Sequence, residues 1–421
     1  MWADRVELVA VQVKGWHVVQ VPGNTPRAGW RIGIDAVWAE GNPSGTGMYT
    51  SELIRALVRT DPHNTYYIYF RDPEAAEANL RVFEAPNLVK RVVKGSPRNL
   101  RNQLLARHLS RDRIDLFHST GFYLPYLWRG RKVVTFHDAN FVRFQQFWWR
   151  PGARFSYLTL RAQTPLSSAQ SRFVVTVSHT AARDIAQYLH VPDKKLRVIY
   201  PGVRTDLDPN PPHETIAATL ARYTLERGRY LLYVGVLAPH KNLERLVKAF
   251  AASRDESDET TVLGQSGPFK LVLAGKSDGP FANEVIRPLV KSLGCDDVVV
   301  FTGYVSNEEL NHLYVAARAV AQISEAEGFG LPVLEAMACG APVIVSDATA
   351  TAEAAGDAAL LVPPTDVERI AEAIAHVRDD DASWQNLRQR GLERARHFTW
   401  DEAARHMLRL YEEAIIGVPE R

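Results

Sequence analysis

The sequence has only two cysteines in 421 residues, Cys295 and Cys339. Two cysteines cannot build the disulfide framework of a small secreted scaffold, and no zinc-ligand spacing surrounds either of them. We therefore expect a reducing, cytoplasmic compartment and no bound metal. The apolar content of 46 % and the charged content of 23 % are ordinary for a globular protein, which excludes an intrinsically disordered chain.

Long apolar runs are also missing. No stretch of about 18 uninterrupted apolar residues occurs, so the sequence predicts no membrane-spanning helix. The run Val6–Val21 comes nearest to a secretion signal, but charged residues interrupt it and no basic region precedes a clean apolar core. We interpret residues 1–30 as an N-terminal extension and not as a signal.

Net charge is small, at +2, but its distribution is uneven. Residues 1–200 contain 28 Lys and Arg against 15 Asp and Glu (+13), which leaves 22 against 33 (−11) for residues 201–421. Nine cations lie between Arg81 and Arg113, a segment with only two acidic residues. Such a patch attracts polyanions, namely nucleic acid, an anionic lipid surface or a phosphorylated substrate. A solvated arginine-rich surface is the alternative interpretation.

Short apolar runs alternate with amphipathic helical stretches along most of the chain. Runs of this kind, with little internal alternation, are typical of strands buried on both faces of a parallel sheet. They are Arg31–Ala36, Tyr66–Phe70, Leu116–His118, Lys132–Phe136, Phe173–Ser178 and Leu196–Ile199, then Tyr230–Val236, Lys270–Ala274, Val298–Gly303, Ala319–Ile323, Pro342–Ser346 and Ala359–Val362. This alternation predicts doubly wound α/β sheets.

The strands form two series, separated by the segment Pro201–Pro212 with its four prolines. Prolines and turn formers at this density indicate a connection between domains. We predict two Rossmann-like domains that face a deep cleft. Their limits are 31–203 for the first domain, 204–228 for the linker, 229–385 for the second domain and 386–421 for C-terminal helices that pack back across both. Ligands of such sheets bind beyond the carboxyl ends of the strands.

The most informative segment is Glu327–Ala341 (EGFGLPVLEAMACGA), which follows a predicted strand. Gly328 and Gly330 permit a close approach of the backbone to a ligand because they lack a Cβ. Pro332 suits the first turn of a helix. The segment therefore predicts a strand, a glycine loop and a short helix whose free N–H groups favour a phosphate or diphosphate.

Two glutamates belong to this segment. Glu335, in the predicted helix, is suited to accept hydrogen bonds from vicinal hydroxyls such as those of a ribose, and Glu327 reaches another part of the ligand. Alternatively, Glu335 only complements the helix dipole and Glu327 is a surface charge.

These residues resemble the Glu-x7-Glu signature of the retaining glycosyltransferases of family four, which have the GT-B fold. The resemblance extends over most of the chain in the same order. It covers 31–57 (RIGIDAVWAEGNPSGTGMYTSELIRAL), 133–141 (VVTFHDANF), 174–178 (VVTVS), 198–203 (VIYPGV), 232–246 (LYVGVLAPHKNLERL), 301–314 (FTGYVSNEELNHLY), 342–347 (PVIVSD), 356–362 and 398–411.

The resemblance implies roles for individual residues. Glu327 and His137 are the implied catalytic residues, with His137 at the end of an apolar strand and close to the transferred sugar. Lys241 would bind the donor diphosphate. His240, where the family often has an arginine, would contribute partly to donor binding, and its protonation would make that binding depend on pH. The family often has an arginine at the position of Val236, which this chain lacks.

Further donor-binding positions follow from the same resemblance. Tyr304 and Val305 correspond to base-contacting positions, and the two glycines of NPSGTGMY approach the donor phosphate and the acceptor. The implied donor-binding set is Gly45, Gly47, Lys241, His240, Tyr304, Val305, Phe329, Gly330, Leu331 and Glu335.

The family transfers a hexosyl unit from a nucleotide sugar with retention of anomeric configuration, and without a metal ion or other cofactor. The resemblance favours mannose and a GDP-linked donor over UDP- or ADP-linked ones. It implies a glycan or lipid-linked acceptor in polysaccharide or glycoconjugate synthesis. An anionic membrane surface is a further expected partner through the basic first domain, at the inner face of the cell membrane, whereas no nucleic-acid partner is expected.

Two alternatives remain from the sequence. One keeps the fold but changes the chemistry to that of a nucleotide-sugar epimerase. The other is a GT-B scaffold that binds a nucleotide sugar or polyanion without turnover, an interpretation supported by the valine at 236.

Overall fold

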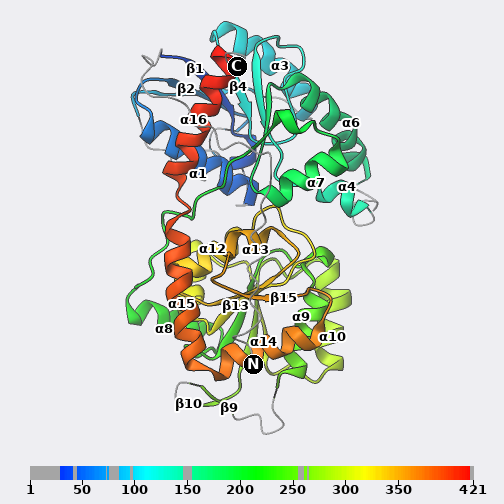
Figure 1. Cartoon of the computed structure of the whole chain (residues 1–421), viewed down its shortest axis with the longest axis vertical. Helices are drawn as coiled ribbons and strands as arrows, with labels where there is room; N and C mark the ends of the chain where they lie inside the picture. Colours follow the sequence, from blue (N-terminus) through cyan, green and yellow to red (C-terminus); the bar gives the residue numbers. More distant parts are fainter. Residues whose placement is uncertain are drawn as a thin grey trace.

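The structure, a computed structural model, describes residues 29–40, 45–72, 74, 85–94, 98–145, 154–254, 260–262 and 265–417. It contains two α/β domains, which lie one above the other in Figure 1. Each domain is built on a parallel sheet covered by helices, so the predicted fold class is confirmed.

The first domain has a seven-stranded sheet in the order β3-β2-β1-β4-β5-β6-β7, and all neighbouring strands pair in parallel. The central strands are buried almost throughout, as expected from their uninterrupted apolar runs. The strands are β1 Arg31–Asp35, β2 Thr65–Phe70, β3 Leu88–Val92, β4 Leu116–Ser119, β5 Arg131–Thr135, β6 Phe173–Thr176 and β7 Leu196–Val198.

The second domain has a six-stranded parallel sheet in the order β12-β11-β8-β13-β14-β15. Its strands are β8 Tyr230–Val234, β11 Lys270–Ala274, β12 Val299–Gly303, β13 Ala319–Gln322, β14 Val343–Ser346 and β15 Leu360–Val362. A separate antiparallel hairpin joins β9 (Thr260–Val262) to β10 (Gln265–Gly267).

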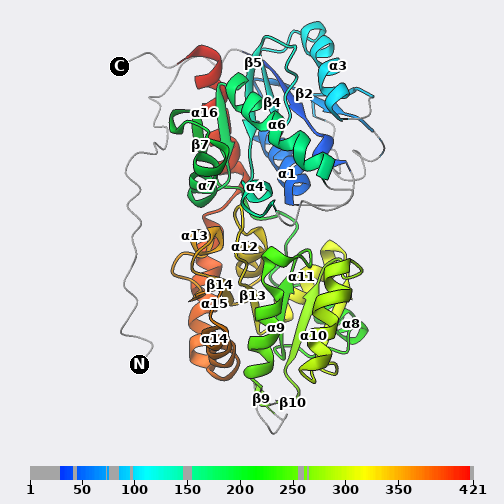
Figure 2. The same ribbon diagram turned by 90° about the vertical axis from the view of Figure 1, so that its right-hand side faces the viewer.

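Helices connect the strands and cover the faces of both sheets (Figures 1 and 2). Those of the first domain are α1 Gly45–Thr60, α3 Arg98–Arg111, α4 Asn140–Arg143, α6 Arg154–Gln170 and α7 His179–Leu189. The remainder are α8 His213–Arg222, α9 Leu243–Ala252, α10 Arg287–Ser292, α11 Asn307–Ala316, α12 Leu331–Ala338, α13 Ala350–Ala355, α14 Val367–Asp379, α15 Asp381–Arg396 and α16 Trp400–Ile416. Within the described residues, no helix is long and apolar enough to cross a membrane.

The interval 204–228, which we expected to be a linker, contains helix α8. This helix packs against α11 of the second domain because its Ile216 and Leu220 are buried in the hydrophobic core. The chain crosses between the domains within residues 199–212, which connect β7 to α8.

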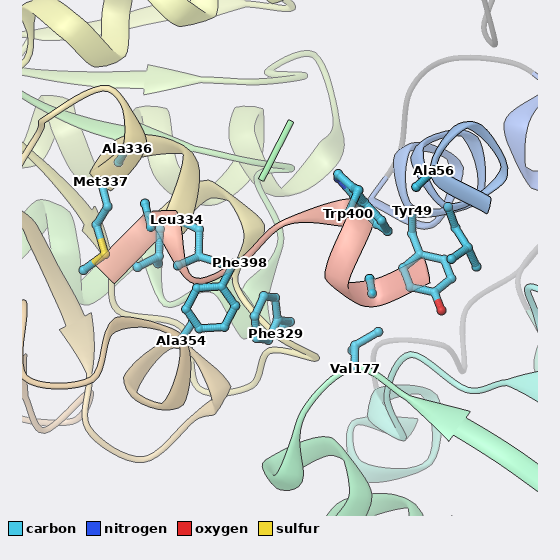
Figure 3. Close-up of a cluster of buried hydrophobic side chains, with 14 of the residues drawn as sticks. Tyr49, Ala56, Val177, Phe329, Leu334, Ala336, Met337, Ala354, Phe398 and Trp400 are labelled. Atoms are coloured by element: carbon cyan, nitrogen blue, oxygen red, sulfur yellow. The ribbon is translucent and has the colours of Figure 1, made fainter. Parts of the chain in front are cut away.

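The chain crosses between the domains a second time at the start of α16, which packs on α1 of the first domain. The two crossings touch, since the Val203 N–H donates to the Phe398 carbonyl at 2.9 Å. A Cβ at Gly202 would lie 2.2 Å from the Trp400 backbone nitrogen, so this approach requires glycine. Figure 3 shows the apolar cluster that continues from Leu334 and Phe398 to Trp400 and α1.

Candidate active site between the two domains

The carboxyl ends of the two sheets face each other across the domain boundary (Figure 1). His137 follows β5 of the first domain, and Glu327 follows β13 of the second. The two domains meet at this point, because a Cβ on Gly328 would lie only 2.5 Å from the His137 carbonyl oxygen. The side chains that we predicted to be catalytic therefore belong to loops in direct contact.

His137 is held in one protonation state by its surroundings. Its Nε2 lies 2.9 Å from the Thr120 carbonyl oxygen, which can only accept, so Nε2 carries the proton. Burial lowers the pKa of His137 to about 4. The ring is therefore neutral near pH 7, with Nδ1 as an acceptor, and Tyr49 fixes its plane by an edge-on contact at 4.8 Å between ring centroids.

Lys241 and Glu327 form an ion pair in the second domain. The Lys241 Nζ donates to Glu327 Oε1 at 2.7 Å, and the Ser324 hydroxyl donates to the same oxygen at 2.8 Å. Both charged side chains are mostly buried, at 19 % and 15 % exposed. The structure thus brings together the two groups predicted to contact the diphosphate and the sugar of one donor.

The glycine loop leads into helix α12 as the sequence predicted. Gly330 has a φ of +103°, in the region that favours glycine, and Pro332 lies in the first turn of the helix. Leu331 begins the helix. Pro332 has no N–H and the Val333 N–H donates to the Gly330 carbonyl at 3.0 Å, so the N–H groups left for a ligand here are those of Gly330 and Leu331. The ring of Phe329 is buried between Tyr200 and Phe398, which leaves only its backbone for a ligand (Figure 3).

Glu335 is buried inside the second domain. Its Oε2 accepts from the Tyr314 hydroxyl at 3.0 Å, and its Oε1 lies 3.9 Å from Nε of Arg204. Oε1 is buried and has no hydrogen-bond partner among the described residues. Burial also raises the pKa of the carboxyl group. A buried acceptor without a donor is costly, but this oxygen has no exposed surface in this conformation, so a ligand hydroxyl reaches it only if the surrounding side chains move.

His240 does not provide a cation near neutral pH. Burial, and secondarily the Lys241 charge, lower the pKa of His240 to about 4. Its ring lies 6.4 Å from Phe144 of the first domain. The ring is therefore neutral near pH 7, so the pH dependence that we expect from its protonation would lie near pH 4, and the part of His240 in donor binding stays a prediction. Asp138, next to His137, accepts from the Asn140 N–H at 2.8 Å in a local turn just before α4.

The remaining predicted positions differ in accessibility. Tyr304 is 63 % exposed, whereas Val305 is buried in the core, so only Tyr304 offers its side chain to a ligand in this conformation. Gly45 and Gly47 form the first turn of α1, and the four residues before them lie outside the described part of the chain. His118 is a packing residue, because it is buried with one nitrogen 2.6 Å from the Tyr411 hydroxyl and the other 2.8 Å from Thr135 Oγ1.

A cavity of about 590 Å³ lies elsewhere, between the end of α1 and residues 85–87. It is next to Thr65, at the amino end of β2. The strands are parallel, so this cavity is at the opposite end of the sheet from His137 and contributes nothing to the interdomain site.

Two family profiles match this chain, one described as Glycosyltransferase Family 4 over residues 43–207 and one as Glycosyl transferases group 1 over residues 221–397. The O-antigen chain mannosyltransferase B of Escherichia coli is 31 % identical over 298 residues, which are 70 % of this chain and 74 % of that protein. The chain therefore belongs to the group 1, family 4 glycosyltransferases.

Other similarities agree with this assignment. The MMP alpha-(1->4)-mannosyltransferase of Mycolicibacterium hassiacum is 30 % identical over 276 residues, 64 % of this chain and 61 % of that protein. Sucrose-phosphate synthase from Thermosynechococcus elongatus has a TM-score of 0.70 at 23 % identity, over 92 % of this chain and all of that structure. The Anabaena protein HepE in complex with UDP and glucose has a TM-score of 0.69 at 17 % identity, over 91 % of this chain and all of that structure. At these identities the solved structures establish the GT-B fold alone.

Proposed function

We propose that this protein is a retaining glycosyltransferase that moves a hexosyl unit, mannose from GDP-mannose, to a glycan or lipid-linked acceptor. The observation that supports it most directly is the contact at Gly328, where the Lys241–Glu327 pair of one domain meets His137 of the other. The mannosyltransferase names of two relatives support the sugar. HepE, crystallised with UDP and glucose and also with UDP-glucose, supports a nucleotide-sugar donor. The relatives are transferases by name, which favours transfer over the epimerase and scaffold alternatives.

In this proposal the second domain binds the donor. Lys241 and the N–H groups at the start of α12 stabilise the charge on the departing nucleotide diphosphate, so the chain itself provides the positive charge. After a rearrangement that exposes it, Glu335 Oε1, which has no hydrogen-bond partner among the described residues, accepts from the ribose hydroxyls. Tyr304 packs against the base. Glu327 accepts from the hydroxyls of the donor sugar, and its negative charge stabilises positive character at the sugar ring.

The transfer itself conserves atoms and charge. The bond between the anomeric carbon and the phosphate oxygen breaks, and the acceptor oxygen bonds to the same face of that carbon. The acceptor proton passes to the departing phosphate oxygen. His137 is neutral, with its proton on Nε2 directed at the Thr120 carbonyl. Its Nδ1 accepts a hydrogen bond from a hydroxyl of the transferred sugar. Contact between the domains excludes water from the reacting carbon.

Donor hydrolysis tests the stereochemical part of this proposal without a known acceptor. With GDP-α-mannose alone, we expect slow release of mannose, and proton NMR in the first minutes should show the α anomer before mutarotation. The β anomer as the first product would contradict retention.

We also propose that the first domain docks on an anionic membrane at the cytoplasmic face, where a lipid-linked acceptor would lie. The support is a set of exposed apolar side chains on α6 and in the loop between β4 and β5, which contacts α6 through Tyr126, with arginines beside them. The apolar side chains are Leu127, Phe155, Leu158 and Leu166, exposed by 73 %, 78 %, 46 % and 43 %, and the exposed arginines are Arg129, Arg154 and Arg161. Apolar insertion combined with cationic attraction is how peripheral proteins bind such surfaces.

Vesicle flotation tests the membrane proposal. The wild-type protein should float with phosphatidylglycerol vesicles at low salt, and the double variant Phe155→Glu/Leu158→Glu should not. Leu293→Glu, which alters an exposed leucine of the second domain, is the matched control and should float like the wild type. Equal flotation of the wild type and the double variant would refute this surface.

A further inference from the structure

The carboxylate of Glu353 makes an unusual set of contacts across the domain boundary. Glu353 is in α13 of the second domain. Among the described residues, the groups that donate hydrogen bonds to its carboxylate belong to His179, Thr180 and Tyr200 of the first domain. Oε1 accepts from the His179 N–H at 2.7 Å and from the Tyr200 hydroxyl at 2.8 Å. Oε2 accepts from the Thr180 N–H at 2.9 Å and from the Thr180 hydroxyl at 3.0 Å.

The two N–H groups belong to the first turn of α7, where the helix has free donors and a positive dipole end. A carboxylate there gains both charge-assisted hydrogen bonds and a favourable dipole interaction. Because the carboxylate and the helix belong to different domains, this stabilisation exists only while the domains are together. Figure 2 shows α7 and α13 side by side at the boundary.

The same helix end also holds the glycine loop. The hydroxyl of Ser178, the N-cap of α7, accepts from the Ala181 N–H at 2.9 Å and donates to the Gly328 carbonyl at 2.6 Å. Gly328 is the neighbour of Glu327 in the chain. The N-terminus of α7 thus contacts both α13 and the loop that carries Glu327.

Helix α13 and the glycine loop also pack on each other. A Cβ at Gly330 would lie 2.9 Å from Cγ2 of Thr351, in the first turn of α13. Arg394 of α15 binds the C-terminal end of α13. Its guanidinium donates to the carbonyls of Glu353 and Ala354, at 2.9 Å each. The loop, α13 and α15 are therefore connected, and they meet the first domain at the start of α7.

From these contacts we infer that Glu353 and the N-terminus of α7 form an interdomain latch, and that Ser178 couples this latch to the position of Glu327. Glu353 is a positioning residue. Closure of the latch brings the glycine loop onto His137, and release of the latch separates Glu327 from the acceptor domain while the donor groups of the second domain stay together. The kinetic consequence rests on the proposed transferase function, whereas the domain separation does not.

Distance measurements between the domains test the latch directly. Both native cysteines are buried, so spin labels can be attached to cysteines introduced at the exposed positions Leu127 and Leu361, one in each domain. In this labelled protein, Glu353→Ala should shift the interdomain distances to longer and broader values. Glu393→Ala removes an exposed carboxylate of α15 that pairs with Arg396 of the same helix, and it should leave the distances unchanged.

Enzyme kinetics provide the second readout. Loss of these charge-assisted bonds should lower kcat by about tenfold in Glu353→Ala. The affinity for the nucleotide should stay within about twofold, because the diphosphate groups belong to the second domain. A merely structural role of Glu353 would instead lower the thermal stability without a change in the interdomain distance of the folded protein.

A second variant keeps the test decisive if Glu353→Ala does not fold. Thr180→Ala/Tyr200→Phe removes two of the four donors and retains the carboxylate, so it should lengthen the interdomain distance to a smaller extent. Unchanged distances in every folded variant would overturn the latch, whatever the enzyme transfers. Longer distances in a protein that turns over no nucleotide sugar would uphold the latch and refute the proposed function instead.

Discussion

The variant Glu327→Gln is expected to lose about 10³-fold in kcat while it retains the fold and binds the nucleotide. The glutamine keeps the shape of the side chain but removes the negative charge that stabilises the sugar ring. Lys241 also loses its partner at 2.7 Å, so the diphosphate should bind with equal or higher affinity. Initial rates of nucleotide release and calorimetric titration with GDP measure the two effects separately.

Glu325→Gln is the matched control for this experiment. It removes a charge two residues away in the same loop, where Glu325 pairs with Arg245 at 2.6 Å on a partly exposed surface. Since partly exposed pairs contribute little, we expect kcat within about threefold of the wild type. A Glu327→Gln variant that keeps a tenth or more of the wild-type rate would contradict the role of Glu327.

The second large effect is expected from Gly328→Ala, at about a hundredfold loss of kcat. The added methyl group would lie 2.5 Å from the His137 carbonyl oxygen, which is a backbone atom and cannot rotate away. The φ of Gly328 is not in the left-handed region, so alanine introduces no backbone strain of its own. The clash is thus confined to the contact between the domains. Rates fall because the domains cannot close, while each domain stays folded.

Gly279→Ala provides the comparison, because a Cβ there meets no atom within 4 Å and its φ is also outside the left-handed region. It should match the wild type in rate and in thermal stability. Gly328→Ala should differ from it in rate far more than in melting temperature. A large loss of melting temperature without loss of rate would show that Gly328 serves the stability of its own domain and not closure.

The buried strands could be predicted from the sequence because both faces of each strand are covered by other elements. Their apolar runs are therefore uninterrupted. Strand β3 was not predicted because its sequence, LVKRV, contains two cations. The strand lies at the edge of the sheet and is only half-buried. Helix α8 was not predicted because its amphipathic pattern is short and follows several prolines, which we interpreted as a linker.

The interdomain contacts could not be predicted from local patterns. Ser178 and Gly328 are 150 residues apart, and Glu353 reaches residues more than 150 positions earlier in the chain. The neutral state of His240 likewise depends on burial that only the folded protein provides. The motif around Glu327 predicted the loop and the helix, whereas the packing of Val305 required the structure.

The most direct test of the account is a thermal-shift panel with GDP, UDP, ADP and their common sugar conjugates. A ligand at 100 times its dissociation constant stabilises the native state by about 2.7 kcal/mol, which is sufficient to rank the donors. We predict the largest shift with GDP-mannose and its loss in a Lys241→Ala variant. No shift with any nucleotide or nucleotide sugar would contradict the central claim and favour a scaffold that does not bind these donors.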